Sequence, residues 1–394
     1  MAERISLMIV AGEASGDAHA ASLVRALRER APQTRFHFFG ATGREMRAAG
    51  VESTVRSDDL SILGLAEIGR ALPRFWRAYS ALKSEAVSAA PDAVVLIDWP
   101  DFNLKLARAL HRKGTRVIYY ISPQLWAWRS HRVRSLRRNV DLLFTILPFE
   151  KEWYAARGVH QVEFVGHPLA GEVQASMSRE EFCKRHQLER ARPIVSLLPG
   201  SRHKELQRIL PHMLEAARLL SQKRGDIQFV LALAPTRPRA EAEALINIAR
   251  KVSLTWPQTL RVVENETREA LAVSDAAAIT SGTATLEAAL LNVPQVIVYK
   301  ESLINWHILG SLITTAHYGL PNLIAGERLA TELIQNDLTA ERLAEELLAL
   351  LDEERNREFR SRLSEATIKL GTGGASLRAA DAVLRAVREW KQSD

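Results

Sequence analysis

The segment AVVLIDWPDFN, residues 93–103, places two carboxylates directly after an apolar run. An uninterrupted apolar run is typical of a buried parallel strand, and Pro100 ends the strand because proline cannot donate to a strand ladder. In open α/β sheets, ligands bind outside the carboxyl ends of the strands. Asp98 is therefore predicted at the rim of a substrate crevice. The alternative is that Asp98 or Asp101 only caps the following helix, expected over residues 104–113.

The same alternation of short apolar runs with helix-length segments occurs twice along the chain. It is typical of right-handed βαβ units and parallel sheets, so we expect two doubly wound α/β domains. The expected strands are residues 7–10, 36–39, 94–97, 117–120, 142–147 and 163–165 in the first half, and 194–198, 229–232, 260–263, 276–279 and 295–298 in the second.

The length of 394 residues exceeds what a single core usually holds. We expect an N-terminal domain over residues 1–170 and a second domain over 171–370, with the boundary near 168–175. The last segment, residues 371–394, is expected to be a helix that packs back on the first domain. Its apolar side chains recur at helical spacing, at positions 377, 380, 383, 384 and 387.

Composition is that of a soluble globular protein, with 47% hydrophobic and 25% charged residues. No apolar run approaches the roughly 20 residues that span a bilayer, and residues 1–10 do not resemble a signal peptide, so we expect an intracellular protein. Cys183 is the lone cysteine, which excludes an intrachain disulfide and a cysteine-built metal site. The net charge of +7 favours an acidic partner: nucleic acid, a phosphorylated substrate or an anionic membrane.

Each half opens with a strand, a loop of small residues and a helix. In the first half the loop is AGEASGD, residues 11–17, before a helix expected over residues 18–30. Its glycines allow close approach to a ligand, and a tight turn with Asp17 as a helix cap is the alternative. In the second half Gly200 and Ser201 precede Arg202. Free amides at such a helix start bind anions, and the Arg202 guanidinium suits a diphosphate.

A third loop, TSGTATLE, follows the strand expected over residues 276–279. The hydroxyls of Ser281 and Thr283 and the helix amides beside Gly282 can hold phosphate. Glu287, one turn further, can accept two hydrogen bonds from a ribose diol. Ser281 as a plain N-cap is the alternative. Two loops of this type in one half predict a nucleotide site.

The segment SPQLWAWR, residues 122–129, continues to residue 138 with two Trp, one His and five Arg in all. Basic residues interleaved with aromatic ones are typical of some nucleic-acid-binding surfaces. Beside a substrate crevice, the same cations also fit the phosphate of an acidic acceptor. A solvated basic helix face is the remaining alternative.

Several motifs, in order, resemble those of the lipid-A-disaccharide synthase family over nearly the whole chain. They are AGEASGD (11–17), DWPDFN (98–103), SPQLWAWR (122–129), LPFEKEWY (147–154), VGHPL (165–169), LLPGSR (197–202) and SGTATLEAAL (281–290). One departure is the sequence GATG at residues 40–43, where the family usually has a Gly-Gly pair. The resemblance implies the GT-B architecture, in which two Rossmann-like domains face a central cleft.

The resemblance also implies a reaction. A 2,3-diacylglucosamine unit passes from its UDP derivative to 2,3-diacylglucosamine 1-phosphate, which gives a β-1,6-linked tetraacyl disaccharide 1-phosphate and UDP. The anomeric configuration inverts, which requires one base for the acceptor hydroxyl, and Asp98 is expected to be that base. No cofactor is expected. The chain has no Asp-x-Asp pair, so we also expect no metal.

The resemblance assigns further residues to each substrate. The expected substrate-binding residues of the first domain are Glu13, Ser15, Asp101, Asn103, Trp126 and Arg129. The expected UDP-binding residues of the second domain are Gly200, Ser201, Arg202, Ser281, Gly282, Thr283, Glu287 and Asn322. On spacing alone, Asn322 also fits an ordinary turn residue.

Residues 60–83 interleave apolar and aromatic side chains with Arg and Lys. This composition is typical of an interfacial helix on an anionic membrane, although a helix packed on the sheet has the same apolar spacing. Residues 303–318, with Trp306, are a second candidate. We expect a peripheral protein on the cytoplasmic face of the inner membrane of a Gram-negative cell, with no nucleic-acid partner and with an oligomer left open.

Two other functions remain possible from the sequence. One is a UDP-sugar 2-epimerase of the same architecture, which shares the nucleotide site and lacks an acyl-binding surface. The other is a nucleotide- or nucleic-acid-binding protein without catalytic activity. Asp98 disfavours the second function, because a carboxylate in the binding groove repels the phosphates of the ligand.

Overall fold

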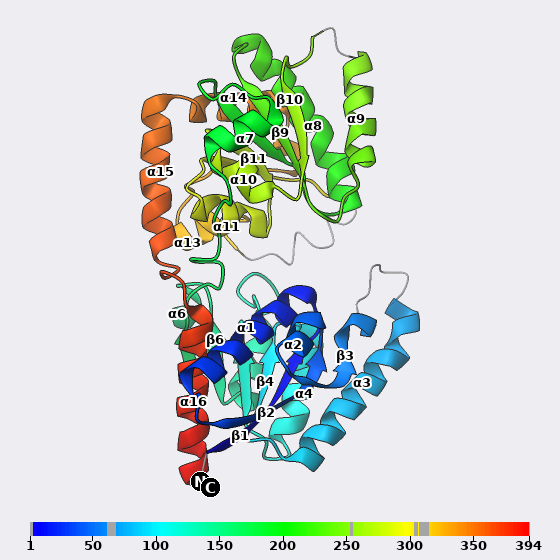
Figure 1. The fold of residues 1–394 in the computed structure, drawn as a ribbon, viewed down its shortest axis with the longest axis vertical. Coiled ribbons are helices and arrows are strands. Elements are labelled where there is room, and N and C mark those ends of the chain that lie inside the picture. The colour runs from blue at the N-terminus through cyan, green and yellow to red at the C-terminus, as the bar shows by residue number, and fades with distance from the viewer. Residues whose placement is uncertain (1–2, 61–67, 253–254, 303–305, 307–314, 394) are drawn as a thin grey trace. The chain divides into compact units, whose positions relative to one another are not determined.

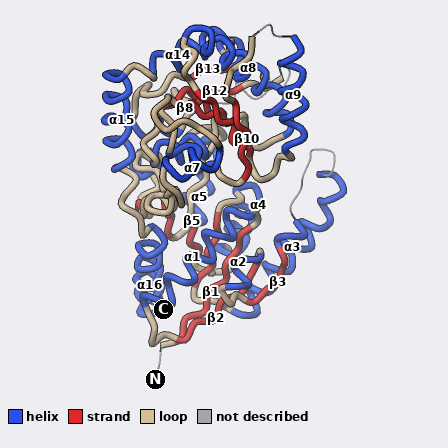
Figure 2. Tube along the Cα trace, turned by 45° about the horizontal axis from the view of Figure 1, so that its top comes forward, coloured by secondary structure: helices blue, strands red, loops and turns tan. Residues whose placement is uncertain are grey.

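The computed structural model describes residues 3–60, 68–252, 255–302, 306 and 315–393, with no side-chain description for residues 59–60 and 68–72. The chain forms two compact units. The first unit consists of Met1–Ala170 and Leu370–Asp394, and the second of Gly171–Lys369. Each is built on one parallel sheet, and helices cover the strands in both (Figures 1 and 2).

The sheet of the first unit has the strand order β3-β2-β1-β4-β5-β6-β7. Its strands are β1 (Arg4–Ala11), β2 (Arg35–Thr42), β3 (Glu52–Arg56), β4 (Ala93–Ile97), β5 (Val117–Tyr120), β6 (Leu142–Thr145) and β7 (Val162–Phe164). The order reverses between β1 and β4, where Ala11 pairs with Ile97. The loops after these two strands therefore start side by side, at the point where doubly wound sheets bind ligands.

Helices cover both faces of this sheet. They are α1 (Ala14–Arg30), α2 (Arg44–Ala48), α3 (Ile68–Ala89), α4 (Pro100–His111), α5 (Val133–Asn139), α6 (Glu150–Ala155) and α16 (Ala375–Ser393), with 3-10 turns η1 (Ser57–Leu60) and η3 (Ser130–Arg132). Alternate strand residues point to opposite faces. Leu7 accordingly packs in one core with α1 and α16, and Met8 packs in the other with α3 and α4.

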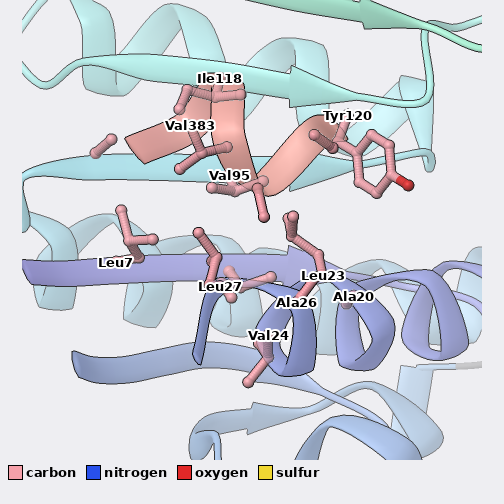
Figure 3. Close-up of a cluster of buried hydrophobic side chains, with 14 of the residues drawn as sticks. Leu7, Ala20, Leu23, Val24, Ala26, Leu27, Val95, Ile118, Tyr120 and Val383 are labelled. Carbon is pink, nitrogen blue, oxygen red and sulfur yellow. The ribbon is translucent and has the colours of Figure 1, made fainter. Parts of the chain in front are cut away.

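Helix α16 packs against α1 in the first unit, although it follows the second unit in the chain (Figure 1). Figure 3 shows its Val383 beside Ile118 and Val95 of the sheet, and Leu23 and Leu27 of α1 belong to the same buried cluster. At the rim of this core, the ion pairs Arg385–Glu163 and Arg388–Glu3 connect α16 to the rest of the unit.

The second unit repeats the plan with the strand order β10-β9-β8-β11-β12-β13. Its strands are β8 (Ile194–Leu198), β9 (Gln228–Leu233), β10 (Leu260–Glu264), β11 (Ala276–Thr280), β12 (Gln295–Tyr299) and β13 (Glu332–Ile334). Its helices are α7 (Arg179–His186), α8 (His203–Lys223), α9 (Arg239–Val252), α10 (Thr267–Ala272), α11 (Thr283–Leu290), α13 (Leu320–Ala325), α14 (Ala340–Leu350) and α15 (Glu353–Ile368), with the turn η5 (Gln335–Asp337). Leu198 pairs with Ile279 at the reversal, so the loops after β8 and β11 are neighbours.

The prediction of two doubly wound parallel sheets is confirmed, and every strand expected from the sequence is present. Two strands were missed. β3 is largely polar and β13 has three residues, so neither contains an apolar run; each lies at an edge of its sheet.

For two helices, the predicted first residue lies four positions too far along the chain. Helix α1 begins at Ala14, not residue 18, and α4 begins at Pro100, not residue 104. Proline suits the first position of a helix, because its fixed φ is helical and its missing N–H has no partner there. Pro100 thus ends one element and begins the next.

Candidate functional site

Asp98 follows β4 in a backbone conformation that is rare for a residue with a side chain. Its φ is +48°, and that of Trp99 is +50°. Left-handed conformations of this kind cost about 1 to 3 kcal/mol each and persist only where neighbouring groups hold them. Two buried side chains do so. Asn103 Nδ2 donates to the carbonyls of Ile97 (3.1 Å) and Asp98 (2.8 Å), and Tyr119 Oη donates to the Asp98 carbonyl (2.7 Å).

The Asp98 turn also contacts the loop after β1. The Trp99 ring stacks on Phe102 with centroids 4.0 Å apart. It lies so close to Gly12 that a Cβ there would be 2.1 Å from a ring carbon. Position 12 therefore excludes every side chain, and the motifs that begin at residues 11 and 98 form one structure.

The environment of Asp98 favours its protonated form. Burial raises the pKa of the Asp98 carboxyl above its ordinary value, and the nearby negative charge of Glu13 raises it further. Glu13 itself is exposed, as is Ser15 in the first turn of α1. A carboxylate with a raised pKa is the better proton acceptor, which is what general-base catalysis requires. The capping alternative is wrong, because the N-cap of α4 is Trp99 and no side chain makes a capping hydrogen bond at this helix start.

Asp17 caps a helix other than its own. Its buried carboxylate accepts hydrogen bonds from the amides of Gly43 (2.9 Å), Glu45 (2.7 Å) and Met46 (3.1 Å), at the start of α2. A Cβ at Gly43 would lie 2.4 Å from this carboxylate. The first motif and the GATG segment therefore meet in a structural contact.

The basic segment after β5 divides into two parts. Arg129 and Arg132 both pair with Asp101, at 3.0 and 2.6 Å, and Arg129 lies over the Trp128 ring at 4.1 Å. The remaining three arginines, at positions 134, 137 and 138, lie on the exposed face of α5. The expectation of a solvated basic face is right for these three, whereas Asp101 and Arg129 form a charged cluster beside the Asp98 turn.

Trp126 and Asn103, both predicted to bind substrate, are buried. The Trp126 indole donates to Glu150 Oε1 at 2.9 Å, and Glu150 Oε2 accepts from the amides of Ile146 and Leu147. Burial raises the pKa of Glu150, and these donors oppose the increase. In the structure, Trp126 anchors the loop that carries Arg129, and Asn103 holds the Asp98 backbone.

A cavity of about 860 Å³ opens at the strand reversal of the second unit. A volume of this size is typical of small-molecule sites. Seven of the eight predicted UDP residues line it: Gly200, Ser201, Arg202, Ser281, Gly282, Thr283 and Glu287. The structure thus brings together two loops that are about 80 residues apart, as parallel strand order requires.

The amides expected to bind phosphate after β8 already have an acceptor. Glu205 Oε2 accepts from the amides of Ser201 (2.9 Å) and Arg202 (3.1 Å), and Glu205 Oε1 pairs with the Arg202 guanidinium. A glutamate three residues into a helix commonly reaches back in this way. The expectation of free amides is therefore wrong for this structure, and an anion that binds these amides has to displace Glu205.

Two other predicted residues have structural bonds. Ser281 does not cap α11; its Oγ donates to the Tyr318 carbonyl at 3.0 Å, and the N-cap is Gly282. Asn322 lies in helix α13, is fully buried and does not line the cavity. Its Nδ2 donates to the Ala330 carbonyl (2.8 Å) and to Glu332 Oε1 (2.9 Å). Direct contact between Asn322 and UDP stays a prediction.

Sequence reasoning missed Arg268, which lines the cavity from α10. Its Nε and Nη2 each lie 3.0 Å from Glu287 Oε1. No pattern in the surrounding NETREA segment distinguishes this arginine from a surface charge. Its place directly after β10, at the carboxyl edge of the sheet, was the available signal.

Within the described residues, no group of three or more His, Cys, Asp or Glu side chains is arranged to hold a metal ion. In the same part of the chain, no helix is long and apolar enough to cross a membrane.

Comparison with known proteins identifies relatives over nearly the whole chain. A family described as lipid-A-disaccharide synthetase matches residues 7–387. The lipid-A-disaccharide synthase of Geobacter metallireducens is 42% identical over 379 residues, which is 96% of each chain. Among solved structures, a putative UDP-N-acetylglucosamine 2-epimerase from Listeria monocytogenes has a TM-score of 0.66 at 17% identity, and covers 99% of this chain and 98% of its own. A glycosyltransferase from Rickettsia africae has a TM-score of 0.60 at 10% identity, with both chains covered completely. The GT-B type of fold is thereby confirmed.

Proposed function

The chain belongs to the lipid-A-disaccharide synthetase family, a family of glycosyltransferases, and on this premise we propose its substrates and mechanism. The donor is UDP-2,3-diacylglucosamine and the acceptor is 2,3-diacylglucosamine 1-phosphate. The products are the β-1,6-linked tetraacyl disaccharide 1-phosphate and UDP. The observation that carries the proposal is the Asp98 carboxylate, held at the strand reversal of the first unit with a raised pKa.

The reaction is a single displacement. The acceptor 6-hydroxyl oxygen attacks the anomeric carbon of the donor, and the bond from that carbon to the diphosphate oxygen breaks. The electron pair leaves with UDP, the hydroxyl proton passes to the Asp98 carboxylate, and the configuration inverts. Asn103 and Tyr119 contribute by fixing the backbone of the base before substrate binds.

The donor nucleotide occupies the cavity of the second unit. Arg202 and the loop 281–283 bind the diphosphate, and Glu287 accepts hydrogen bonds from the ribose hydroxyls. Arg202 is suited to this role because its side chain is 80% exposed, and among the described residues its ion pair is with Glu205. Cationic and dipolar groups placed there stabilise the charge that develops on the leaving diphosphate, so the reaction proceeds without a metal ion.

The protein works at an anionic membrane surface, where it takes up acylated substrates. Helix α3 supports this through Trp76, which is 71% exposed between the exposed Arg74 and Arg77. Its other face is not available to lipid, because Phe75 packs against Trp99 with ring centroids 5.9 Å apart. Residues 61–67 of the expected interfacial segment 60–83, and most of the second candidate over 303–318, lie outside the described residues.

The decisive test is a reaction with purified protein. We expect UDP release that requires both the donor and the 1-phosphate acceptor, with a tetraacyl disaccharide as product. Release without acceptor, or conversion of a UDP-sugar to its 2-epimer, contradicts the proposal and favours the epimerase alternative.

The membrane contact has its own test with a matched pair of variants. Trp76→Ser should reduce sedimentation with phosphatidylglycerol vesicles while the protein stays folded, because Trp76 faces solvent. Phe75→Ser should instead lower the melting temperature, because it loses ring contacts with Trp99 and Phe102. Unchanged vesicle binding by Trp76→Ser, or no vesicle binding by the wild type, refutes the α3 assignment.

A further inference from the structure

Arg268 is a cation of the second-unit cavity to which the proposed reaction gives no role. It lies in the first turn of α10, and its side chain is 37% exposed. Two of its nitrogens, Nε and Nη2, contact one oxygen of Glu287, and its Nη1 donates to the Glu172 carbonyl at 3.4 Å. The guanidinium is thus held at both ends, between α11 and the segment that enters the unit.

This arrangement leaves Glu287 with one occupied and one open oxygen. Oε1 accepts a hydrogen bond from Arg268 Nε and lies 3.0 Å from Nη2, while Oε2 has no partner among the residues that the structure describes. Glu287 lines the cavity, and its side chain is only 20% exposed. Because the guanidinium is planar and rigid, its two-nitrogen contact restricts the rotation of the carboxylate.

We propose that Arg268 is a positioning residue, which orients Glu287 so that the cavity selects nucleotides with a complete ribose diol. The inference rests on the proposed function, in which Glu287 accepts from the ribose of UDP. A carboxylate that is oriented before binding loses little conformational freedom when the ligand arrives. Without Arg268, Glu287 has to be ordered by the ligand itself, or turns away from it.

A direct role for Arg268 on the diphosphate predicts a different pattern. A phosphate contact contributes equally to UDP and to 2′-deoxy-UDP, because the two differ only at the ribose. A positioning role acts through the hydroxyls alone. The ratio of the two dissociation constants therefore separates the two roles, and a general loss of stability does not mimic a change in that ratio.

The experiment is calorimetric titration of the full-length protein with UDP and with 2′-deoxy-UDP. A hydrogen bond to a charged acceptor contributes enough that the wild type should prefer UDP by about tenfold or more. In Arg268→Ala, UDP should bind about tenfold more weakly, equivalent to about 1.4 kcal/mol, and 2′-deoxy-UDP, which keeps only the 3′-hydroxyl, should weaken by less, so that the preference for UDP falls. The preference of Arg268→Lys for UDP should lie between those of the wild type and Arg268→Ala. This variant serves as the test if the alanine variant does not fold.

Two further variants serve as controls. Arg239→Ala removes a guanidinium that pairs with a glutamate, Glu243, in the same unit but outside the cavity, and should change neither affinity. Glu287→Ala should abolish the preference for UDP by itself. Adding Arg268→Ala to it should then weaken UDP binding no further, because both residues act in one interaction.

Each alternative outcome refutes a specific statement. Equal weakening of both nucleotides in Arg268→Ala assigns the residue to the diphosphate and overturns the inference, as does an unchanged ratio. A wild-type protein that binds UDP without preferring it over 2′-deoxy-UDP overturns the inference and leaves the donor site standing. A wild-type protein that does not bind UDP overturns both.

Discussion

Replacing Asn103 by alanine tests whether the backbone of Asp98 has to be held in place for catalysis. The variant removes two hydrogen bonds, to the Ile97 and Asp98 carbonyls. Each hydrogen bond contributes about 1 kcal/mol to stability. Together the two bonds offset much of the cost of one left-handed residue, which is about 1 to 3 kcal/mol. Tyr119 retains one bond to Asp98, so the protein should fold, with a free energy of unfolding about 2 kcal/mol lower.

The loss of activity should be larger than the loss of stability suggests. Once the restraint is removed, the turn relaxes and the carboxylate shifts, and a shift of about 1 Å costs about 100-fold in rate. Turnover should therefore fall by about that factor, while UDP affinity stays unchanged because the proposed nucleotide site lies in the second unit. Steady-state kinetics and calorimetry on the same sample measure the two effects.

Asn139→Ala is the matched control for this variant. Asn139 lies in the same unit and also donates two hydrogen bonds, to the backbone and side chain of Ser135, with no contact to the Asp98 turn. Its loss should lower stability and leave turnover intact. Near-normal turnover in a folded Asn103→Ala protein, or an equal loss of turnover in Asn139→Ala, would refute the reasoning.

Three further predictions concern charge. Asp98→Asn should lower turnover about 100- to 10,000-fold with little change in UDP affinity. In the wild type, the acid limb of the kcat/KM profile should lie above the ordinary aspartate pKa of 3.8, because burial raises the pKa of Asp98. An acid limb at or below 3.8 contradicts the assignment of Asp98 as the base. Arg202→Ala should weaken UDP binding about tenfold in calorimetry, and unchanged affinity in both this variant and Glu287→Ala removes the donor site from the cavity. Burial, with the neighbouring His19, lowers the pKa of His167 from 6.5 to about 4, so below pH 6.5 the unfolded chain binds a proton that the folded chain does not. Stability should then fall by about 2 kcal/mol between pH 7 and 5, and urea unfolding at both values should show a smaller difference in His167→Gln.

The sequence predicted the positions of loops better than the partners of side chains. In a doubly wound sheet, the carboxyl ends of neighbouring strands necessarily meet, so the apolar runs alone were enough to bring Gly200 and Ser281 to one cavity. The partners of charged groups follow no such rule. Asp17 accepts from Gly43, 26 residues away, and Arg268 pairs with Glu287, 19 residues away. Each pairing depends on how helices pack, which no local pattern encodes.

Some signals were present in the sequence and were weighed wrongly. Glu205 stands three residues into its helix, where a side chain reaches back to the first amides, and this predicts the contact that occupies the Ser201 amide. Proline at position 100 likewise indicates a helix that begins there. The burial of Trp126 and the bond from its indole to Glu150 had no such local signal, and its contact with substrate stays a prediction.

There is a physical reason why Asp98 and the side chains that hold its backbone are neighbours in the DWPDFN segment. Asp98 supplies the carboxylate, and its left-handed backbone is a conformation that glycine would adopt at lower cost, so a side chain is retained there at the expense of strain. The same six residues carry the restraint. Pro100 starts the helix whose first turn brings Asn103 back to the carbonyls of Ile97 and Asp98, and Phe102 supports the Trp99 ring. A carboxylate and the side chains that hold its backbone are thus encoded together in six residues, whereas Glu287 of the second unit pairs with Arg268 from a different helix.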